Sequence, residues 1–227
     1  MGTLASNRKG FITGASASNY GAALEVTTGT ASDSASTAVN ALQYFRSSGR
    51  GGGTFRFIRT FLHFNTSGIS GGSDFSVQLT SGGANSTEAL CKVTAVKHTA
   101  GSSSGGELAN SDFNNVLVST PYSNSTTFGS SGTVEIGLNA AAVTQIVNNS
   151  DFNVAILLTL DLPAGLEEDP LSSDGDVSNI IAFGSAINLV YTDAASGYTH
   201  KINTLAAASI GKVNTLATAS IDKINTK

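Results

Sequence analysis

The 227-residue sequence has few charged residues, a single cysteine and no tryptophan. Charged residues make up 12% of the chain, the formal net charge is −4, and no dense block of Lys and Arg is present. Because phosphate binding depends on clustered cations, this composition argues against a nucleic-acid partner. The lone Cys91 excludes an internal disulfide and a metal-thiolate site, and its apolar neighbours favour a buried, inert thiol.

Long apolar runs are also missing from the chain. The opening residues, MGTLASNRKGFITG, place no apolar core of about seven residues after Arg8 and Lys9, so they do not resemble a secretory signal. No stretch reaches the roughly 18 apolar residues of a membrane span. We therefore expect a protein that is made in a cytoplasm and has no membrane partner.

The chain does contain a series of short strand-like runs separated by turns rich in Gly and Ser. The expected strands are residues 22–27, 54–64, 75–79, 90–97, 116–119, 133–138, 152–160 and 186–191. This pattern predicts an all-β fold, an antiparallel jelly roll or β-sandwich with one or two short helices. The length suits one such domain, residues 1–199, followed by a tail of residues 200–227.

Two segments are expected to be helical. Asn139 is an N-cap residue before a run of helix formers that stops at residues 148–149, and residues 34–45 carry apolar side chains at a spacing of three. The nearly unbroken apolar run 152–160 predicts a central, buried strand. In residues 54–64, four phenylalanines compete for the inside, and a bulge near residues 58–60 would reconcile their pattern.

Three motifs occur in an order found in a known family: Asn19-Tyr-Gly, then Leu24-Glu-Val, then RTFLHFNTSGI from Arg59. They resemble the DNRLRE-type domain, a carbohydrate-binding-module-like jelly roll, over about residues 10–192. The resemblance implies a jelly-roll fold and, as one functional alternative, a carbohydrate-binding adhesin module that holds host surface glycans. Asn65 replaces the usual Asp of that family, and with no tryptophan the chain has little material for a flat aromatic sugar platform.

The tail contains an eleven-residue repeat, in which KINTL from Lys201 returns as KVNTL from Lys212 and begins again as KINT from Lys223. On a helix its apolar residues fall within an arc of roughly 160°. They are Ile202, Leu205, Ile210, Val213, Leu216, Ile221 and Ile224. The period favours a right-handed helical supercoil, whereas Gly211 and the Asn-Thr pairs disfavour a helix, so short strands with turns at Asn-Thr are the alternative.

In either conformation so small a segment cannot bury its apolar side alone, and we expect it to lie on its own sandwich or on a neighbouring subunit. Residues 208–214 and 219–225 resemble the A-S-I-x-K-[IV]-N repeats that end virion structural proteins of marine bacteriophages. This resemblance implies a virion structural protein, either a capsid decoration or cement protein or a tail or fibre component. Its partners would be other virion proteins and copies of itself, and it would be assembled in the host cytoplasm.

No catalytic motif is visible, and we expect no enzymatic activity. The serines lack the nucleophile elbow of a hydrolase. Because sixteen acidic residues allow many spatial pairs, a depolymerase that cleaves polysaccharide with two carboxylates is a further alternative.

The acidic segment from Glu167 to Asp176 gathers five of the sixteen acidic residues. We interpret it as a solvated loop, with Ca²⁺ at Asp169, Asp174 and Asp176 as the alternative, and we expect no other cofactor. The three histidines, His63, His98 and His200, lack metal-ligand spacing and are interpreted as ordinary strand or loop residues. Asp161, which follows the apolar run 152–160, is expected to brace a loop.

Overall fold

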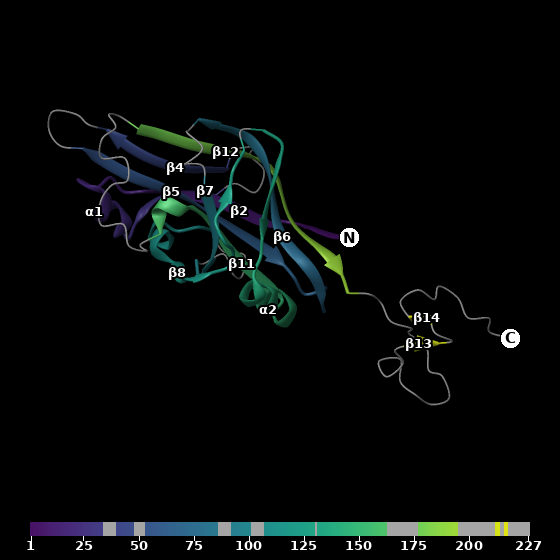
Figure 1. Cartoon of the computed structure of the whole chain (residues 1–227). Coiled ribbons are helices and arrows are strands. Elements are labelled where there is room, and N and C mark those ends of the chain that lie inside the picture. The colour runs from purple at the N-terminus through teal and green to yellow at the C-terminus, as the bar shows by residue number, and fades with distance from the viewer. Residues whose placement is uncertain are drawn as a thin grey trace.

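The computed structural model is an antiparallel β-sandwich with two short α-helices, as the strand pattern of the sequence predicts (Figure 1). It describes residues 1–33, 40–47, 53–85, 92–100, 107–129, 131–162, 177–194, 212–213 and 216–217. No helix among these residues has the length and apolar character that crossing a membrane requires.

The elements follow one another along the chain in a mostly strand-to-strand order. The strands of the sandwich are β1 (Gly2–Ala5), β2 (Arg8–Gly14), β3 (Gly29–Asp33), β4 (Asn40–Ser47), β5 (Thr54–Asn65), β6 (Gly72–Asn85), β7 (Lys92–His98), β8 (Val116–Pro121), β9 (Thr126–Thr127), β10 (Thr133–Gly137), β11 (Asp151–Leu158) and β12 (Val177–Asp193). The helices are α1 (Tyr20–Leu24), α2 (Ala140–Asn148) and the short 3₁₀ helices η3 (Asn110–Asn114) and η4 (Thr159–Asp161). Strands β13 (Lys212–Val213) and β14 (Leu216–Ala217) form a two-stranded sheet of their own.

Strand β5 belongs to both layers of the sandwich. The hydrogen-bonded order is β10-β6-β12-β4-β5-β11-β7-β8, with β2 paired to the other edge of β5 and β3 paired to β2. The first half of β5, up to Ile58, pairs with β4, and the second half, from Thr60, pairs with β11. The strand therefore changes its partner at Arg59, and the two layers are connected through one continuous backbone.

The bulge expected near residues 58–60 is not present. The register of β2 against β5 continues unbroken from Thr13↔Ile58 to Arg8↔His63. Phe57 and Phe61 share one face of β5, whereas Phe64 lies on the opposite face and stacks on Phe152 at 6.2 Å between ring centroids. The prediction was wrong because both faces of β5 are buried beyond residue 58, so its phenylalanines do not compete for one side.

Two further sequence predictions are corrected by the structure. Residues 40–45 of the expected helix lie in β4, which pairs with β5 on one edge and β12 on the other, and residues 34–39 lie outside the described part. Gln43 and Tyr44 are buried, and Phe45 contacts its β5 partner Arg56 in a cation–π arrangement. Non-local pairing on both edges overrides the helical spacing.

The expected strand at residues 22–27 begins instead as helix α1, which ends at Leu24. The side chain of Asn19 caps the helix by accepting a hydrogen bond from the Ala22 amide at 2.8 Å. Tyr20 then enters an aromatic cluster with Tyr44 and Phe57 and donates a hydrogen bond to the Leu160 carbonyl. In the Asn-Tyr-Gly motif, Asn19 thus caps helix α1 and Tyr20 fixes the helix to the core.

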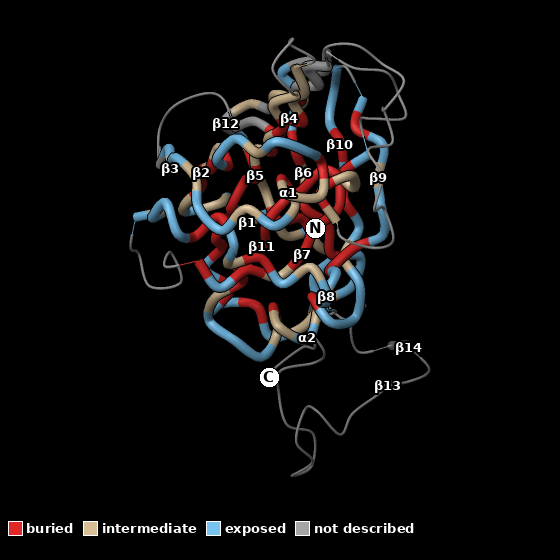
Figure 2. The backbone as a smooth tube through the Cα atoms, turned by 90° about the vertical axis from the view of Figure 1, so that its left-hand side faces the viewer, coloured by how far each residue is buried: buried red, intermediate tan, exposed pale blue. Residues whose placement is uncertain are grey.

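The core lies between the layers and continues under α2. Figure 2 shows the buried segments gathered along the middle strands, with exposed segments on the outside. The predicted central strand is confirmed: in β11 every residue from Phe152 to Leu158 is buried, because both edges are paired and both faces are covered. At the first strand, Gly2 pairs with Tyr191, and a side chain at Gly2 would come within 2.4 Å of the Tyr191 ring, which stacks on Phe75.

Candidate functional site

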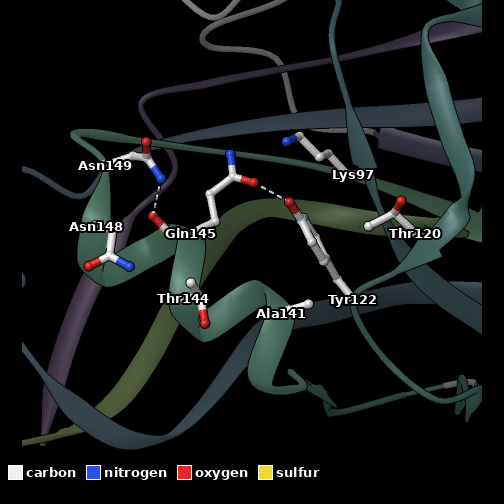
Figure 3. A pocket seen from close by; sticks show the side chains of 8 residues that line it. All are labelled: Lys97, Thr120, Tyr122, Ala141, Thr144, Gln145, Asn148 and Asn149. Atoms are coloured by element: carbon white, nitrogen blue, oxygen red, sulfur yellow. Dashed lines mark hydrogen bonds between the residues drawn. The ribbon is translucent and has the colours of Figure 1, made fainter.

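A pocket of about 420 Å³ opens where β7, the chain around the end of β8 and helix α2 meet (Figure 3). The residues that line it are mostly amides, hydroxyls and one ammonium group. They are Lys97, Thr120, Tyr122, Ala141, Thr144, Gln145, Asn148 and Asn149. None of them is acidic, so the pocket presents one positive charge and several hydrogen-bonding groups.

The N-terminal end of α2 is fixed to the wall of the pocket by Asn139. The Asn139 side chain accepts hydrogen bonds from the amides of Ala141 and Ala142, which is the capping role predicted from the sequence. Its amide nitrogen also donates to the Pro121 carbonyl at 2.7 Å, and its backbone N–H donates to the Tyr122 carbonyl at 2.8 Å. One residue therefore holds the helix and the opposite wall together.

The other end of α2 is tied to the end of β5. Asn149 bonds the Gln145 carbonyl through both its backbone and its side-chain nitrogen, at 3.1 and 3.0 Å. The Thr66 hydroxyl donates to the Asn149 carbonyl, and the Thr66 amide donates to the Ser150 carbonyl. Because both ends of the helix are anchored, the residues of its exposed side keep fixed positions over the pocket.

Tyr122 lines the pocket and orients Gln145. Its ring is buried against Phe152, with 5.4 Å between ring centroids, and its hydroxyl donates a hydrogen bond to Oε1 of Gln145. Burial raises the pKa of Tyr122 to about 12, so the hydroxyl keeps its proton and acts as a donor at neutral pH. Because Oε1 is engaged, the Nε2 amino group of Gln145 is left as a donor toward the pocket.

Lys97 supplies the charge of the pocket. It lies on β7, pairs with Val154 of β11 and is half-buried. Within the described residues its ammonium group has neither an ion-pair nor a hydrogen-bond partner. Figure 3 shows this ammonium group on the same side of the Tyr122–Gln145 hydrogen bond as the amide nitrogen of Gln145.

A second polar centre, deep in the sandwich, is complete in itself. Arg59 forms a two-point ion pair with Asp161, with Nε to Oδ2 at 2.6 Å and Nη2 to Oδ1 at 2.7 Å. Its Nη1 donates to the Phe113 carbonyl at 2.7 Å, and the guanidinium carbon lies 4.0 Å from the centre of the Phe113 ring. Burial raises the pKa of the Asp161 carboxyl, an effect that the adjoining guanidinium opposes. Asp161 braces η4 and η3 against β5, as the sequence predicted for a loop.

The Phe113 ring reaches Arg59 because Gly14 makes room for it. A side chain at Gly14 would come within 2.6 Å of the ring. Asp112 holds the surrounding η3 turn by accepting hydrogen bonds from the Ala109 amide and from the Asn115 side chain. The arrangement satisfies a buried cation with a carboxylate, a carbonyl and an aromatic face.

His63 and His98 are both buried strand residues, as the sequence interpretation has them. His98 Nε2 donates to the Leu62 carbonyl at 3.0 Å, and Nδ1 accepts from the Ala100 amide at 3.2 Å, which fixes a neutral ring. Burial lowers the pKa of His98 to about 4, and the Leu62 carbonyl opposes that shift. His63 lies between Asn7 and Asp151, with contacts of 2.8 and 3.0 Å.

The other candidate residues of the sequence are only partly covered by the structure. In the tail, Val213 of β13 pairs with Leu216 of β14, while Ile202, Leu205, Ile210, Ile221 and Ile224 lie outside the described residues. Cys91, His200 and the calcium candidates Asp169, Asp174 and Asp176 also lie outside them. Among the residues that the structure does describe, no group of three or more His, Cys, Asp or Glu side chains could hold a metal ion.

Sequence reasoning missed the pocket. It identified Asn139 as a cap, but Lys97, Tyr122 and Gln145 come from three separate segments, and no spacing in the sequence connects them. Comparison with family models and with curated proteins gives no match to the chain.

Proposed function

We propose that this protein is a non-enzymatic structural component of a bacteriophage virion, joined to neighbouring subunits through its C-terminal repeat. The observation that supports the proposal most strongly is the sheet formed by β13 and β14 in the middle copy of the repeat. Among the described strands, these two pair only with each other. In the described part of the chain, these four residues of the repeat therefore pair with each other and not with a strand of the sandwich.

The size of this sheet supports the need for a partner. Val213 and Leu216 are directly paired across it. Asn214 and Thr215 separate them in the sequence, at the Asn-Thr position where the strand alternative for the repeat has a turn. Two strands of two residues each are too small to be stable without packing against another surface. In the proposed role, the neighbouring subunit provides that surface.

The test compares the full chain with a version that ends at Thr199. Both are introduced into the phage that carries the gene, and purified particles are examined by immunoblotting and cryo-electron microscopy. We expect the shortened chain to fold, with a melting temperature within a few degrees of the full chain, and to be missing from the particles. Incorporation of the shortened chain at the level of the full one would contradict the proposal.

A matched pair of variants tests the apolar residues of β13 and β14. Replacing Val213 and Leu216 by Ser removes the apolar pair and keeps the length, and we expect incorporation to fall at least about tenfold, which corresponds to about 1.4 kcal/mol. Thr215→Ser, between them in the sequence, serves as the control and should leave incorporation unchanged. An equal effect of both replacements would count against an apolar contact.

A carbohydrate-binding adhesin is the second candidate function, and the pocket beside α2 favours it. Amides and hydroxyls such as those of Thr144, Gln145 and Asn148 are suitable partners for sugar hydroxyls. A glycan array probed with the full chain and with the version ending at Thr199 separates the two candidates. Specific glycan binding that survives the truncation would support the adhesin, whereas binding by neither version would remove it.

A further inference from the structure

We propose that the pocket beside α2 binds the carboxylate group of a small organic acid, held by the ammonium group of Lys97 and the side-chain amide of Gln145. This goes beyond the structural role in a virion, because it depends on the pocket and not on the C-terminal repeat. It also sharpens the adhesin candidate by naming the chemical group that is recognised.

The first step of the argument is the fixed direction of Gln145. An amide side chain can present either an acceptor or a donor, and only a donor attracts an anion. Here the buried hydroxyl of Tyr122 donates to Oε1, so the amide presents Nε2 to the pocket. The fold fixes this direction of the Gln145 amide, since Tyr122 is packed on Phe152 and its backbone carbonyl accepts a hydrogen bond from Asn139.

The second step is the charge balance of the pocket. Lys97 has no ion-pair partner in the described part of the chain, and no acidic residue is among the lining residues. A hydrogen bond between an ammonium group and a carboxylate is roughly twice as strong as one between neutral groups. One ammonium group matches the single charge of a carboxylate, whereas a phosphate dianion would need a second cation that these residues do not supply.

The third step is the position and size of the donors. Lys97 projects from the rigid strand β7 and Gln145 from the anchored helix α2, and Figure 3 shows their nitrogen atoms facing the same space. The volume of about 420 Å³ is at the lower end of the range for small-molecule sites. Thr120 and Asn148, whose side chains have no hydrogen-bond partner in the described part, line the same space and can bond further polar groups of the acid.

The experiment is an NMR titration of the ¹⁵N-labelled full chain with two monocarboxylates, propionate and glucuronate. Propionate represents an acidic protein side chain and glucuronate an acidic sugar, so the stronger of the two tells which source the pocket prefers. Glucose and inorganic phosphate are the comparison compounds. We expect saturable shifts of the Gln145 side-chain amide with at least one of the acids, and about tenfold weaker binding of glucose and of phosphate.

Three variants test the named groups. Lys97→Met removes the charge, keeps an unbranched side chain that is one atom shorter, and should weaken binding of the acid at least about tenfold. Lys92→Met, on the exposed start of the same strand, removes the same charge away from the pocket and should leave affinity unchanged. Tyr122→Phe preserves the packing of the ring but frees the Gln145 amide, and affinity should fall about threefold.

Four outcomes would overturn the proposal. These are the absence of shifts with both acids, equal binding of glucose, tighter binding of phosphate, and equal effects of Lys97→Met and Lys92→Met. Equal binding of glucose would leave the adhesin candidate intact, because a neutral sugar would then be recognised. None of the four bears on the virion role, which the truncation after Thr199 tests separately.

Discussion

Arg59 and Lys97 are both cations next to aromatic and polar groups of the same sandwich, yet they differ in burial and in whether an anion accompanies them. Arg59 is buried and has a carboxylate, a carbonyl and an aromatic ring as partners. Lys97 is half-buried beside Tyr122 and Gln145 and has no anionic partner in the described part of the chain. The centre around Arg59 contains its own anion, the Asp161 carboxylate. The pocket around Lys97 leaves the position of the anion to a ligand.

The comparison shows how a stabilising ion pair can be distinguished from a binding site. A buried charge without a partner costs several kcal/mol, so the fold must provide Asp161 where water cannot reach. A half-buried ammonium group can be solvated and therefore tolerates the lack of a partner. An unpaired cation that lines a pocket is then compatible with stability and available to a ligand.

The largest effect is expected when the same replacement is made at both cations. Arg59→Met leaves the Asp161 carboxylate buried without its partner and should lower the free energy of unfolding by about 3–5 kcal/mol. Lys97→Met removes a half-buried, unpaired charge and should change it by no more than about 0.5 kcal/mol. Urea denaturation followed by circular dichroism measures both. Similar losses of unfolding free energy at the two positions would show that Arg59 and Lys97 do not differ in their contribution to stability.

The next effect tests whether water is excluded from the interior around β5 and β7. His98 has a pKa of about 4 in the folded chain, below its ordinary value of 6.5, because burial disfavours the charged ring. Between these values the unfolded chain binds the extra proton, so stability rises with pH from about 4 to 6.5 and is fully present above that range. The total change from this one residue is about 3 kcal/mol.

The measurement is the free energy of unfolding as a function of pH, for the natural chain and for His98→Gln. Glutamine can donate to the Leu62 carbonyl without titrating, so the difference between the two curves isolates His98 from the carboxylates and from His63. We expect the difference to grow steadily as the pH falls from 6.5 to 4. Parallel curves over this range would mean that the ring is accessible to water.

The smallest effect concerns the hydrogen bonds by which Asn139 holds helix α2 beside the pocket. Asn139→Ala removes the cap of α2 and the hydrogen bond to the Pro121 carbonyl, and we expect a loss of about 1 kcal/mol in stability. Asn148→Ala, at an exposed position of the same helix with no side-chain hydrogen bond in the described part, is the control and should be nearly neutral. Thermal unfolding of the two variants in parallel gives the comparison. Equal melting temperatures would show that Asn139 does not hold the helix in place.

Local signals predicted the fold well wherever they agreed with strand pairing. The apolar run that became β11 and the cap at Asn139 were both identified, because burial on two faces and helix capping leave direct marks in the sequence. The prediction of a helix at β4 was wrong because the local signal and the strand pairing disagree there. Its apolar spacing favours a helix, and only the pairing of both edges with β5 and β12 makes it a strand.

The two polar centres show why site residues are harder to predict than strands. Arg59 and Asp161 are 102 positions apart, and Tyr122 and Gln145 are joined across 23. Neither pair has a sequence spacing set by a helix or a strand, since each depends on which layers come together. The role of Asp161 as a brace was suggested only by its position after a core strand, and nothing indicated its partner.

The position of β12 has a mechanical consequence for a chain attached through its tail. The 17-residue strand precedes the repeat and is hydrogen-bonded to β6 on one edge and to β4 and β1 on the other. Tension applied at its C-terminal end acts along the strand, perpendicular to the antiparallel hydrogen bonds. The ladders on both edges, which are interrupted after Phe183, then resist the pull, so a force on the tail would first have to shear the C-terminal part of β12 from β6 and β1.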